Sequence, residues 1–277
     1  KRNPHIRFLG VFSPKVTPGT ASAFGGVSDS LHGYGIPIAC ASDGPSGIRM
    51  ESGLKATQLP IGTLLACSFN IPMMEELYQM EGRELVGNEI DTLLGPGINI
   101  HRYPLNGRNF EYFSEDPFLA GRLGAAYVSA AQGEDVAVSL KHFAANNQET
   151  NRQTSNSQID ERALREIYLS AFEYVVKTAR PATIMASYNR LNGYYACENR
   201  HLLTEILREE WGFDGVVISD WGACADLAKA VKAGMDLEMP DSHGIHARKL
   251  KAALKAGEIS EEDIAKAAGR IEKLVKK

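Results

Sequence analysis

The 277-residue sequence has few cysteines, and their spacing is not that of a disulfide framework or a metal site. The four are Cys40, Cys67, Cys197 and Cys224, and no two of them form a C-x-x-C pair. Two of the four lie inside apolar, strand-like runs. The spacing therefore favours small buried thiols over disulfides, metal ligands or a nucleophile.

Long apolar runs and an excess of one charge are also missing. The longest apolar runs, such as Thr63–Cys67, are far shorter than the roughly 20 residues that a membrane span needs. The 30 basic and 34 acidic residues give a formal net charge of −4, which provides no basic surface for nucleic acid or anionic lipid. We therefore expect no nucleic-acid partner and no membrane partner.

The composition that is present is ordinary for a globular protein, with 44% hydrophobic and 23% charged residues. No low-complexity linker divides the sequence, so we expect residues 1–277 to form a single domain. The chain does not open with the basic segment and apolar stretch of an export signal, and we expect a cytoplasmic location.

Short apolar runs alternate with helical patterns along most of the chain. The predicted strands are Ile6–Phe12, Ile36–Ala41, Thr63–Cys67, Thr92–Ile98, Val136–Leu140, Ala182–Ser187, Gly215–Ser219 and Met235–Met239. The predicted helices are Met73–Val86, Asp116–Gln132, Asp160–Lys177, His201–Glu210, Cys224–Lys232, Ala247–Lys255 and Glu261–Lys276, the last with Ser260 as its N-cap. Such alternation predicts an α/β fold with a parallel sheet and helices outside it.

The number of predicted strands favours a (β/α)8 TIM-like barrel. An open doubly wound sheet is the alternative. Its usual sign is a glycine-rich turn after the first strand, and Gly25-Gly26 lacks the G-x-G-x-x-G spacing.

Polar side chains follow many of the predicted strands, where a barrel carries its chemistry. They are Asp43, Asn70, His101, Arg102, Arg108, Lys141, His142, Asn146–Glu149, Tyr188–Arg190, Asp220–Gly222 and Asp241. This set combines carboxylates, cations, amides and aromatic rings, which suits a neutral ligand rich in hydroxyl groups. It contains no His/Cys cluster at metal spacing and no phosphate-binding loop, so we expect no metal and no cofactor.

Each of these residues also has a purely structural interpretation. Asp220 can cap the helix that follows it, and Arg108 can pair with a nearby carboxylate such as Glu111. His142 can be a hydrogen-bonded core histidine, and Trp221 a cover over the barrel mouth. Lys141 is the hardest to explain structurally, because a lysine at the end of a buried strand needs an anionic partner.

Several long segments around these residues resemble glycoside hydrolase family 3, in its β-glucosidase-like branch. The segments are Ser42–Gly47, Gly107–Pro117, Lys141–Glu149, Asp160–Glu166, Met185–Asn189 and Gly215–Gly222, in the order of the family. The branch of bacterial N-acetylglucosaminidases carries a histidine in the loop that corresponds to Asn151–Ile159, and this sequence has none there.

The resemblance implies a retaining hydrolase that releases β-linked glucose through a covalent intermediate on Asp220, the catalytic nucleophile. It assigns binding of the glucose ring, directly or as cavity wall, to Asp43, Arg108, Lys141, His142, Met185, Tyr188 and Trp221. A retaining glycosidase also needs a carboxylic acid about 5–5.5 Å from the nucleophile.

In the family that acid usually comes from a second, α/β sandwich domain, which is absent from this chain and is the expected protein partner. Glu111, Glu149 and Glu198 stay open as substitutes. Two alternatives also remain open: a sugar-binding barrel that lacks a proton donor, and a β-xylosidase with the same chemistry.

Overall fold

The computed structural model describes residues 16–50 and 53–276, and their centre is a six-stranded sheet. Its strands, in the order in which they pair, are β1 (Ser22–Gly25), β2 (Ile38–Asp43), β3 (Thr92–Leu94), β4 (Ala137–Phe143), β6 (Thr183–Ala186) and β9 (Val216–Ser219). The pair β1–β2 is antiparallel, and the other pairs are parallel. A second, small sheet contains β5 (Asn156–Ser157), β7 (Arg190–Leu191) and β8 (Tyr194–Tyr195).

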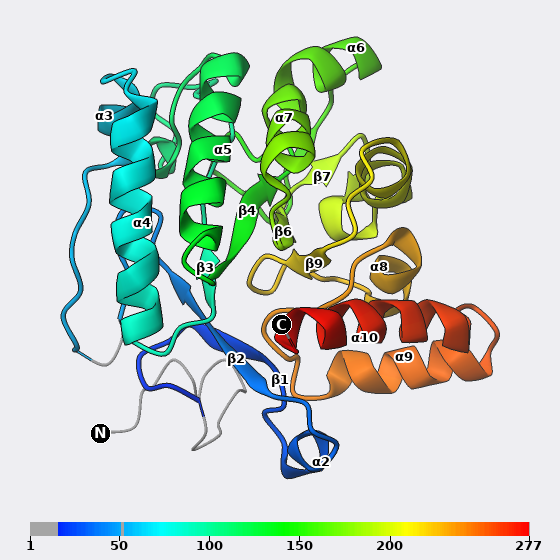
Figure 1. The fold of residues 1–277 in the computed structure, drawn as a ribbon. Helices are drawn as coiled ribbons and strands as arrows, with labels where there is room; N and C mark the ends of the chain where they lie inside the picture. Colours follow the sequence, from blue (N-terminus) through cyan, green and yellow to red (C-terminus); the bar gives the residue numbers. More distant parts are fainter. Residues whose placement is uncertain (1–15, 51–52, 277) are drawn as a thin grey trace.

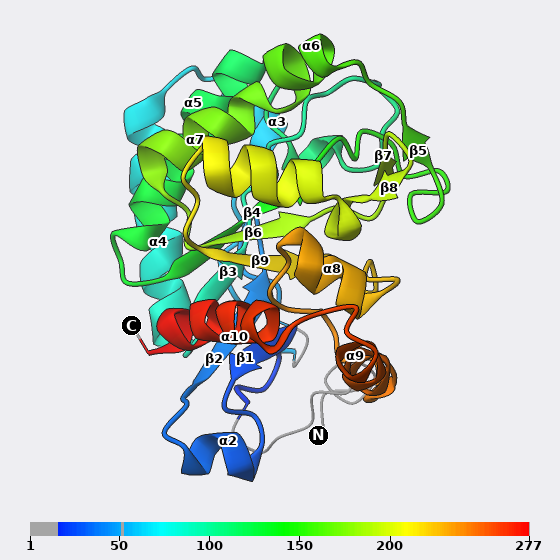
Figure 2. The same cartoon turned by 90° about the vertical axis from the view of Figure 1, so that its right-hand side faces the viewer.

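Helices surround the main sheet, as Figures 1 and 2 show. The chain forms α2 (Asp29–Gly33), α3 (Gly62–Ala66), α4 (Ile71–Gly87), α5 (Pro117–Gln132), α6 (Glu161–Ala163), α7 (Ser170–Ala179), α8 (Leu227–Ala233), α9 (Ile245–Lys255) and α10 (Glu261–Val275). Two 3₁₀ helices, η1 (Asn109–Glu111) and η3 (Ala196–Glu198), and two π-helical segments, η2 (Leu164–Tyr168) and η4 (His201–Glu210), complete the helical elements of the described residues. In Figure 1, α4, α5 and α7 stand in a row along one side of the sheet.

The core lies between the strands and these helices. Phe143 at the end of β4 is fully buried, and its ring packs edge-on against Phe172 of α7 at 5.3 Å and against Trp211 at 5.8 Å between ring centres. Burial of one such side chain contributes about 2–3 kcal/mol. Along the other edge, Val275 of α10 packs in one cluster with Phe24 of β1.

The predicted α/β fold is confirmed, and five of the eight predicted strands correspond to strands of the main sheet. The helix predictions are also confirmed, with Asp160–Lys177 divided among α6, η2 and α7. Ser260 caps α10 as predicted, since its hydroxyl accepts a hydrogen bond from the Asp263 N–H at 3.1 Å and the Asp263 carboxylate accepts from the Ser260 N–H. No helix among the described residues is both long and apolar enough to cross a membrane.

Two strand predictions differ from the structure, and a third falls outside the described residues. Thr63–Cys67 was expected to be a strand and instead falls on helix α3, where the Thr63 hydroxyl donates to the Asn109 carbonyl at 2.7 Å. Met235–Met239 contributes only the bridge between Leu237 and Ile218. Ile6–Phe12 lies outside the described residues, and the antiparallel strand β1 was not predicted.

Helix α4 buries an acid, Glu81, which is 1% exposed and lies beside the Gly47 N–H and the Tyr127 hydroxyl. Burial raises the pKa of Glu81 from 4.5 to about 8. Between pH 4.5 and about pH 8 the folded protein therefore keeps a proton on Glu81 that the unfolded chain has released. The free energy of unfolding falls as the pH rises through this range.

We expect Glu81→Gln to reduce the dependence of stability on pH. One retained proton corresponds to a loss of up to about 1.4 kcal/mol of unfolding free energy per pH unit, and the glutamine cannot titrate. Urea unfolding between about pH 5 and 7 measures this slope. Glu75→Gln, an exposed position on the same helix, is the control. An unchanged slope in Glu81→Gln would show that Glu81 does not hold the proton.

Candidate active site

All eight site residues that the sequence indicated line a single cavity of about 210 Å³. The lining residues are Ala21, Asp43, Arg49, Arg108, Lys141, His142, Met185, Tyr188, Asp220 and Trp221. Ala21 and Arg49 were not predicted. They come from the segment before β1 and the loop after β2, neither of which follows the alternating pattern of parallel strands and helices.

The cavity forms where parallel strands end. Asp43 is the last residue of β2, Lys141 and His142 lie in β4, and Met185 lies in β6. Asp220 follows β9 directly. Because parallel strands end at the same edge of a sheet, residues that are far apart in sequence meet there.

Asp220 is the buried carboxylate of this cavity, at 5% exposure. Its Oδ1 accepts a hydrogen bond from the Trp221 N–H at 2.7 Å. Its Oδ2 has no hydrogen-bond partner among the described residues and lies 3.8 Å from Nη1 of Arg108 and 3.7 Å from Nε2 of His142. Burial raises the pKa of Asp220, whereas the Arg108 charge and the Trp221 N–H act to lower it. Oδ2 is therefore the oxygen of Asp220 whose hydrogen-bonding capacity the described residues leave unused.

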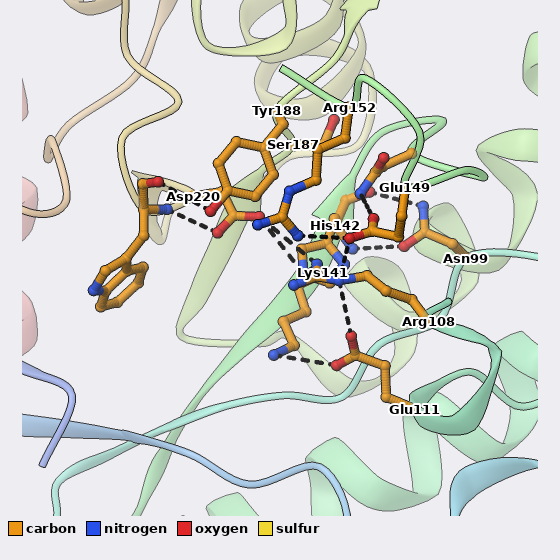
Figure 3. Close-up of polar contacts among 12 residues, drawn as sticks. Asn99, Arg108, Glu111, Lys141, His142, Glu149, Arg152, Ser187, Tyr188 and Asp220 are labelled. Atoms are coloured by element: carbon orange, nitrogen blue, oxygen red, sulfur yellow. Dashed lines mark hydrogen bonds and ion pairs between the residues drawn. The ribbon is translucent and has the colours of Figure 1, made fainter. Parts of the chain in front are cut away.

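Two cations share one acidic partner beside Asp220 (Figure 3). Oε1 of Glu111 lies 3.3 Å from Nε of Arg108, and Oε2 of the same carboxylate lies 3.3 Å from Nζ of Lys141. Lys141 also lies 3.3 Å from Oδ1 of Asp43. Burial alone would lower the pKa of Lys141, but Glu111 and Asp43 outweigh it and the pKa is raised. The lysine stays charged and can donate to a hydroxyl group.

His142 is neutral, because burial and the charges of Arg108 and Lys141 hold its pKa well below the usual range. Its Nε2 contacts Nη1 of Arg108, and its Nδ1 lies 3.1 Å from Oη of Tyr112. An arginine can only donate, so Nε2 is the acceptor and Nδ1 carries the hydrogen. Asn99 fixes the backbone on both sides, since it accepts from the His142 N–H at 2.7 Å and donates to the His142 carbonyl at 2.9 Å.

A further arginine, Arg152, supports the rim and was missed by the sequence analysis. Its guanidinium lies 4.2 Å from the ring centre of Tyr188, and its Nη1 lies 2.6 Å from Oε2 of Glu149. Tyr188 in turn donates to the Trp221 carbonyl at 2.9 Å. Arg152 falls in a polar loop after β4, where spacing carries no signal for a contact with a ring 36 positions later in the sequence.

The structure tests the purely structural interpretations of Asp220 and Arg108. Helix α8 is capped by Asp226 and not by Asp220, so Asp220 has no capping role there. Arg108 does pair with Glu111, as that interpretation expected, and it faces Asp220 at the same time.

A larger cavity of about 420 Å³ lies beside the small sheet and carries a different set of side chains. Its lining includes Arg102, Tyr103 and Tyr168 together with amides and hydroxyls of residues 147–158, and no carboxylate. Because it lacks an acid or a nucleophile, we do not place a reaction there.

The sheet carries a buried carboxylate, two cations paired with one acid, and aromatic walls where its parallel strands end. This arrangement is typical of a TIM-barrel-type catalytic domain. Residues 27–274 match the family model described as the glycosyl hydrolase family 3 N terminal domain. The chain therefore belongs to glycoside hydrolase family 3, and its fold is TIM-barrel-like.

Individual relatives agree with this assignment. The chain is 47% identical to a β-glucosidase from Ruminococcus albus, in an alignment that covers 96% of this chain and 29% of that protein. It is 46% identical to an exo-α-(1→6)-L-arabinopyranosidase from Bifidobacterium longum, over 76% of this chain and 29% of that protein. The crystal structure of a β-glucosidase from Paenibacillus barengoltzii matches with a TM-score of 0.91 and 50% identity, over 95% of this chain and 30% of that one. The chain thus spans about a third or less of the length of these relatives.

Proposed function

We propose that this chain is the part of a retaining β-glucosidase that binds the sugar and carries the nucleophile. The observation that carries the proposal is Asp220, a buried carboxylate that lines a cavity of hydroxyl-binding groups and whose Oδ2 faces Arg108 but has no hydrogen-bond partner among the described residues. Relatives named β-glucosidase support the substrate class.

In this mechanism Oδ2 of Asp220 attacks the anomeric carbon of the sugar, and the bond to the leaving oxygen breaks. A carboxylic acid protonates that oxygen, and a glycosyl ester of Asp220 forms. The same acid, now ionised, then takes a proton from water, which attacks the anomeric carbon and frees Asp220. Two inversions give net retention. The charges of Arg108 and Lys141 favour the ionised form that the first step needs.

The acid of this mechanism is proposed to come from a further domain of the whole protein, the α/β sandwich of the family. Three other carboxylates near the cavity are engaged by cations: Glu111 by Arg108 and Lys141, Glu149 by Arg152, and Asp43 by Lys141. Each of these carboxylates already has an oxygen directed at a cation of the chain. Glu198 does not line the cavity, and its Oε1 accepts from the Asp226 N–H at 3.0 Å. These contacts support an acid from outside residues 1–277.

The proposal is tested by trapping the intermediate with a dinitrophenyl 2-deoxy-2-fluoro-β-glucoside. The fluorine slows both steps and the good leaving group restores the first, so the glycosyl-enzyme accumulates. Peptide mapping should find one sugar on Asp220. A label on another carboxylate would refute the assigned nucleophile, and no label at all would favour the sugar-binding barrel without catalysis.

The glycone is tested separately, because one relative is named for arabinopyranose. A panel of dinitrophenyl β-glucoside, β-xyloside and α-L-arabinopyranoside compares the three sugars on the same leaving group. We expect the glucoside to have the highest kcat/KM. Preference for the xyloside or the arabinopyranoside would keep the chemistry and change the substrate.

We expect Asp43→Ala and Lys141→Ala each to weaken glucose binding by ~2 kcal/mol or more, about thirtyfold in Kd, because each removes a polar partner of the sugar hydroxyls. Asp43 is the cleaner test, since its side chain is 39% exposed, whereas removal of Lys141 also leaves buried Glu111 with one cation fewer. Calorimetric titration with glucose measures both variants. Asp214→Ala, at an exposed carboxylate paired with Lys273, is the control. Unchanged glucose affinity at both positions would contradict the assigned subsite.

A further inference from the structure

Outside the cavity of Asp220, three side chains with different donor atoms come together from three segments. Cys224 lies between β9 and α8, Glu238 lies between α8 and α9, and His246 is the second residue of α9. The Cys224 sulfur, a Glu238 oxygen and a His246 ring nitrogen all lie within 4.8 Å of one another. Helices α8 and α9 contact each other at this end of the molecule, where Figure 2 shows them side by side.

The three donors match the preferences of one kind of ion. A thiolate, an imidazole nitrogen and a carboxylate oxygen are the ligands of Zn²⁺, whereas Ca²⁺ and Mg²⁺ select oxygen alone. Zinc bonds of roughly 2.0–2.3 Å place the donors of a tetrahedral site about 3.3–3.7 Å apart. The contact of 2.5 Å between Nδ1 of His246 and Oε1 of Glu238 would open by about 0.8 Å. The thiol lies within 4.8 Å of both and would close in by at most about 1 Å.

We propose that Cys224, Glu238 and His246 form a binding site for one Zn²⁺ ion, with water as the fourth ligand. The thiol proton leaves to solvent when the ion binds. The site can be reached from outside, since the side chains of Glu238 and His246 are 12% and 16% exposed. Cys224 itself is buried, so its sulfur forms the inner wall of the site.

The surrounding backbone supports this arrangement and connects it to the cavity. The His246 N–H donates to Oγ of Ser242 at 3.0 Å, which holds the start of α9 against the loop. Met239, next to Glu238, accepts through its carbonyl from the Gly222 N–H at 2.8 Å. Gly222 is two residues beyond Asp220. An ion at this site therefore braces the segment that carries Asp220 and Trp221.

The contrasting explanation is that Glu238 and His246 form only an ion pair and that Cys224 is a small apolar side chain, as its sequence context indicates. The two explanations differ in a measurable way. An ion pair needs no thiol, whereas a zinc site loses a ligand when the sulfur is replaced.

The test uses the metal-free chain titrated with ZnCl2 by calorimetry and by thermal unfolding. We expect one Zn²⁺ per chain and a rise in Tm, because an ion that binds only the folded form stabilises it. Cys224→Ser and His246→Gln should each weaken zinc binding by at least about tenfold. Cys67→Ser, which removes an exposed cysteine, should bind as the original chain does.

Cobalt gives an independent readout that does not depend on stability. Co²⁺ bound by a thiolate shows a sulfur-to-metal charge-transfer band in the near ultraviolet. That band should appear in the original chain and in Cys67→Ser and be absent in Cys224→Ser. No stoichiometric zinc binding to the original chain, or binding and a band that survive in Cys224→Ser, would overturn the proposed site. Since neither measurement involves a sugar, failure here leaves the glycosidase proposal untouched.

Discussion

Replacing Asp220 with asparagine is expected to lower kcat/KM for aryl β-glucosides by about four orders of magnitude or more, because binding energy does not compensate for a lost covalent nucleophile. Folding should be unaffected. The asparagine keeps the oxygen that accepts from the Trp221 N–H. It also removes a buried carboxylate whose ionised form burial disfavours, as the raised pKa of Asp220 shows. Steady-state kinetics on the whole protein, together with urea unfolding, measure the two effects.

The matched control for that result is Asp226→Asn, six residues further along the same segment. Asp226 caps α8, and asparagine caps helices about as well, so activity should stay within a few-fold. Comparable losses in both variants would indicate general damage to the segment after β9. Near-normal turnover by Asp220→Asn would contradict its role as the nucleophile.

The second large effect concerns the leaving group when residues 1–277 act without any further domain. A dinitrophenolate departs with little need for a proton, so glycosylation of Asp220 can proceed. Cellobiose and methyl β-glucoside need protonation and should be almost inert. For each protein we compare kcat/KM for the dinitrophenyl glucoside with kcat/KM for cellobiose or methyl β-glucoside. This ratio should be several orders of magnitude larger for residues 1–277 alone than for the whole protein. Parallel assays of the chain and of the whole protein measure it.

Azide provides the check on the second chemical step. Without a general base the glycosyl-enzyme should accumulate, and azide, which needs no deprotonation, should accelerate its breakdown and form the β-glycosyl azide with net retention. Efficient cellobiose hydrolysis by the chain alone, unaffected by azide, would mean that an internal carboxylate such as Glu111 or Glu149 is the acid.

Local patterns predicted the strands and helices that are buried or periodic over their whole length. The runs that became β4, β6 and β9 are mostly apolar and are buried on both faces, as expected for strands of a sheet covered on both sides. The short run Thr63–Cys67 was misjudged, because five residues of which four are apolar fit one turn of helix as well as a strand. Its contacts with the loop at Asn109 and Tyr112 made it a helix.

For the candidate site, residue types at strand ends together with the family resemblance selected eight of the ten residues that line the cavity. They lie at strand ends or in the loops that follow, and motif-length resemblance to one family supported the same positions. Contacts between residues that are far apart in the sequence could not be predicted in this way. Arg152 over Tyr188 is such a case, and so is the cluster of Cys224, Glu238 and His246, whose spacing matches no metal motif.

The sequence by itself determined the alternation of buried strands and amphipathic helices, the family, and the chemical groups available at the strand ends, because these depend on local periodicity and residue type. Only the tertiary structure decided which charges pair and which atoms stay free. Glu111 lies between Arg108 and Lys141, and His142 is neutral. Oδ2 of Asp220 has no hydrogen-bond partner among residues 16–50 and 53–276. Burial and distance set the cost and the strength of every charge, and both exist only once the chain has folded.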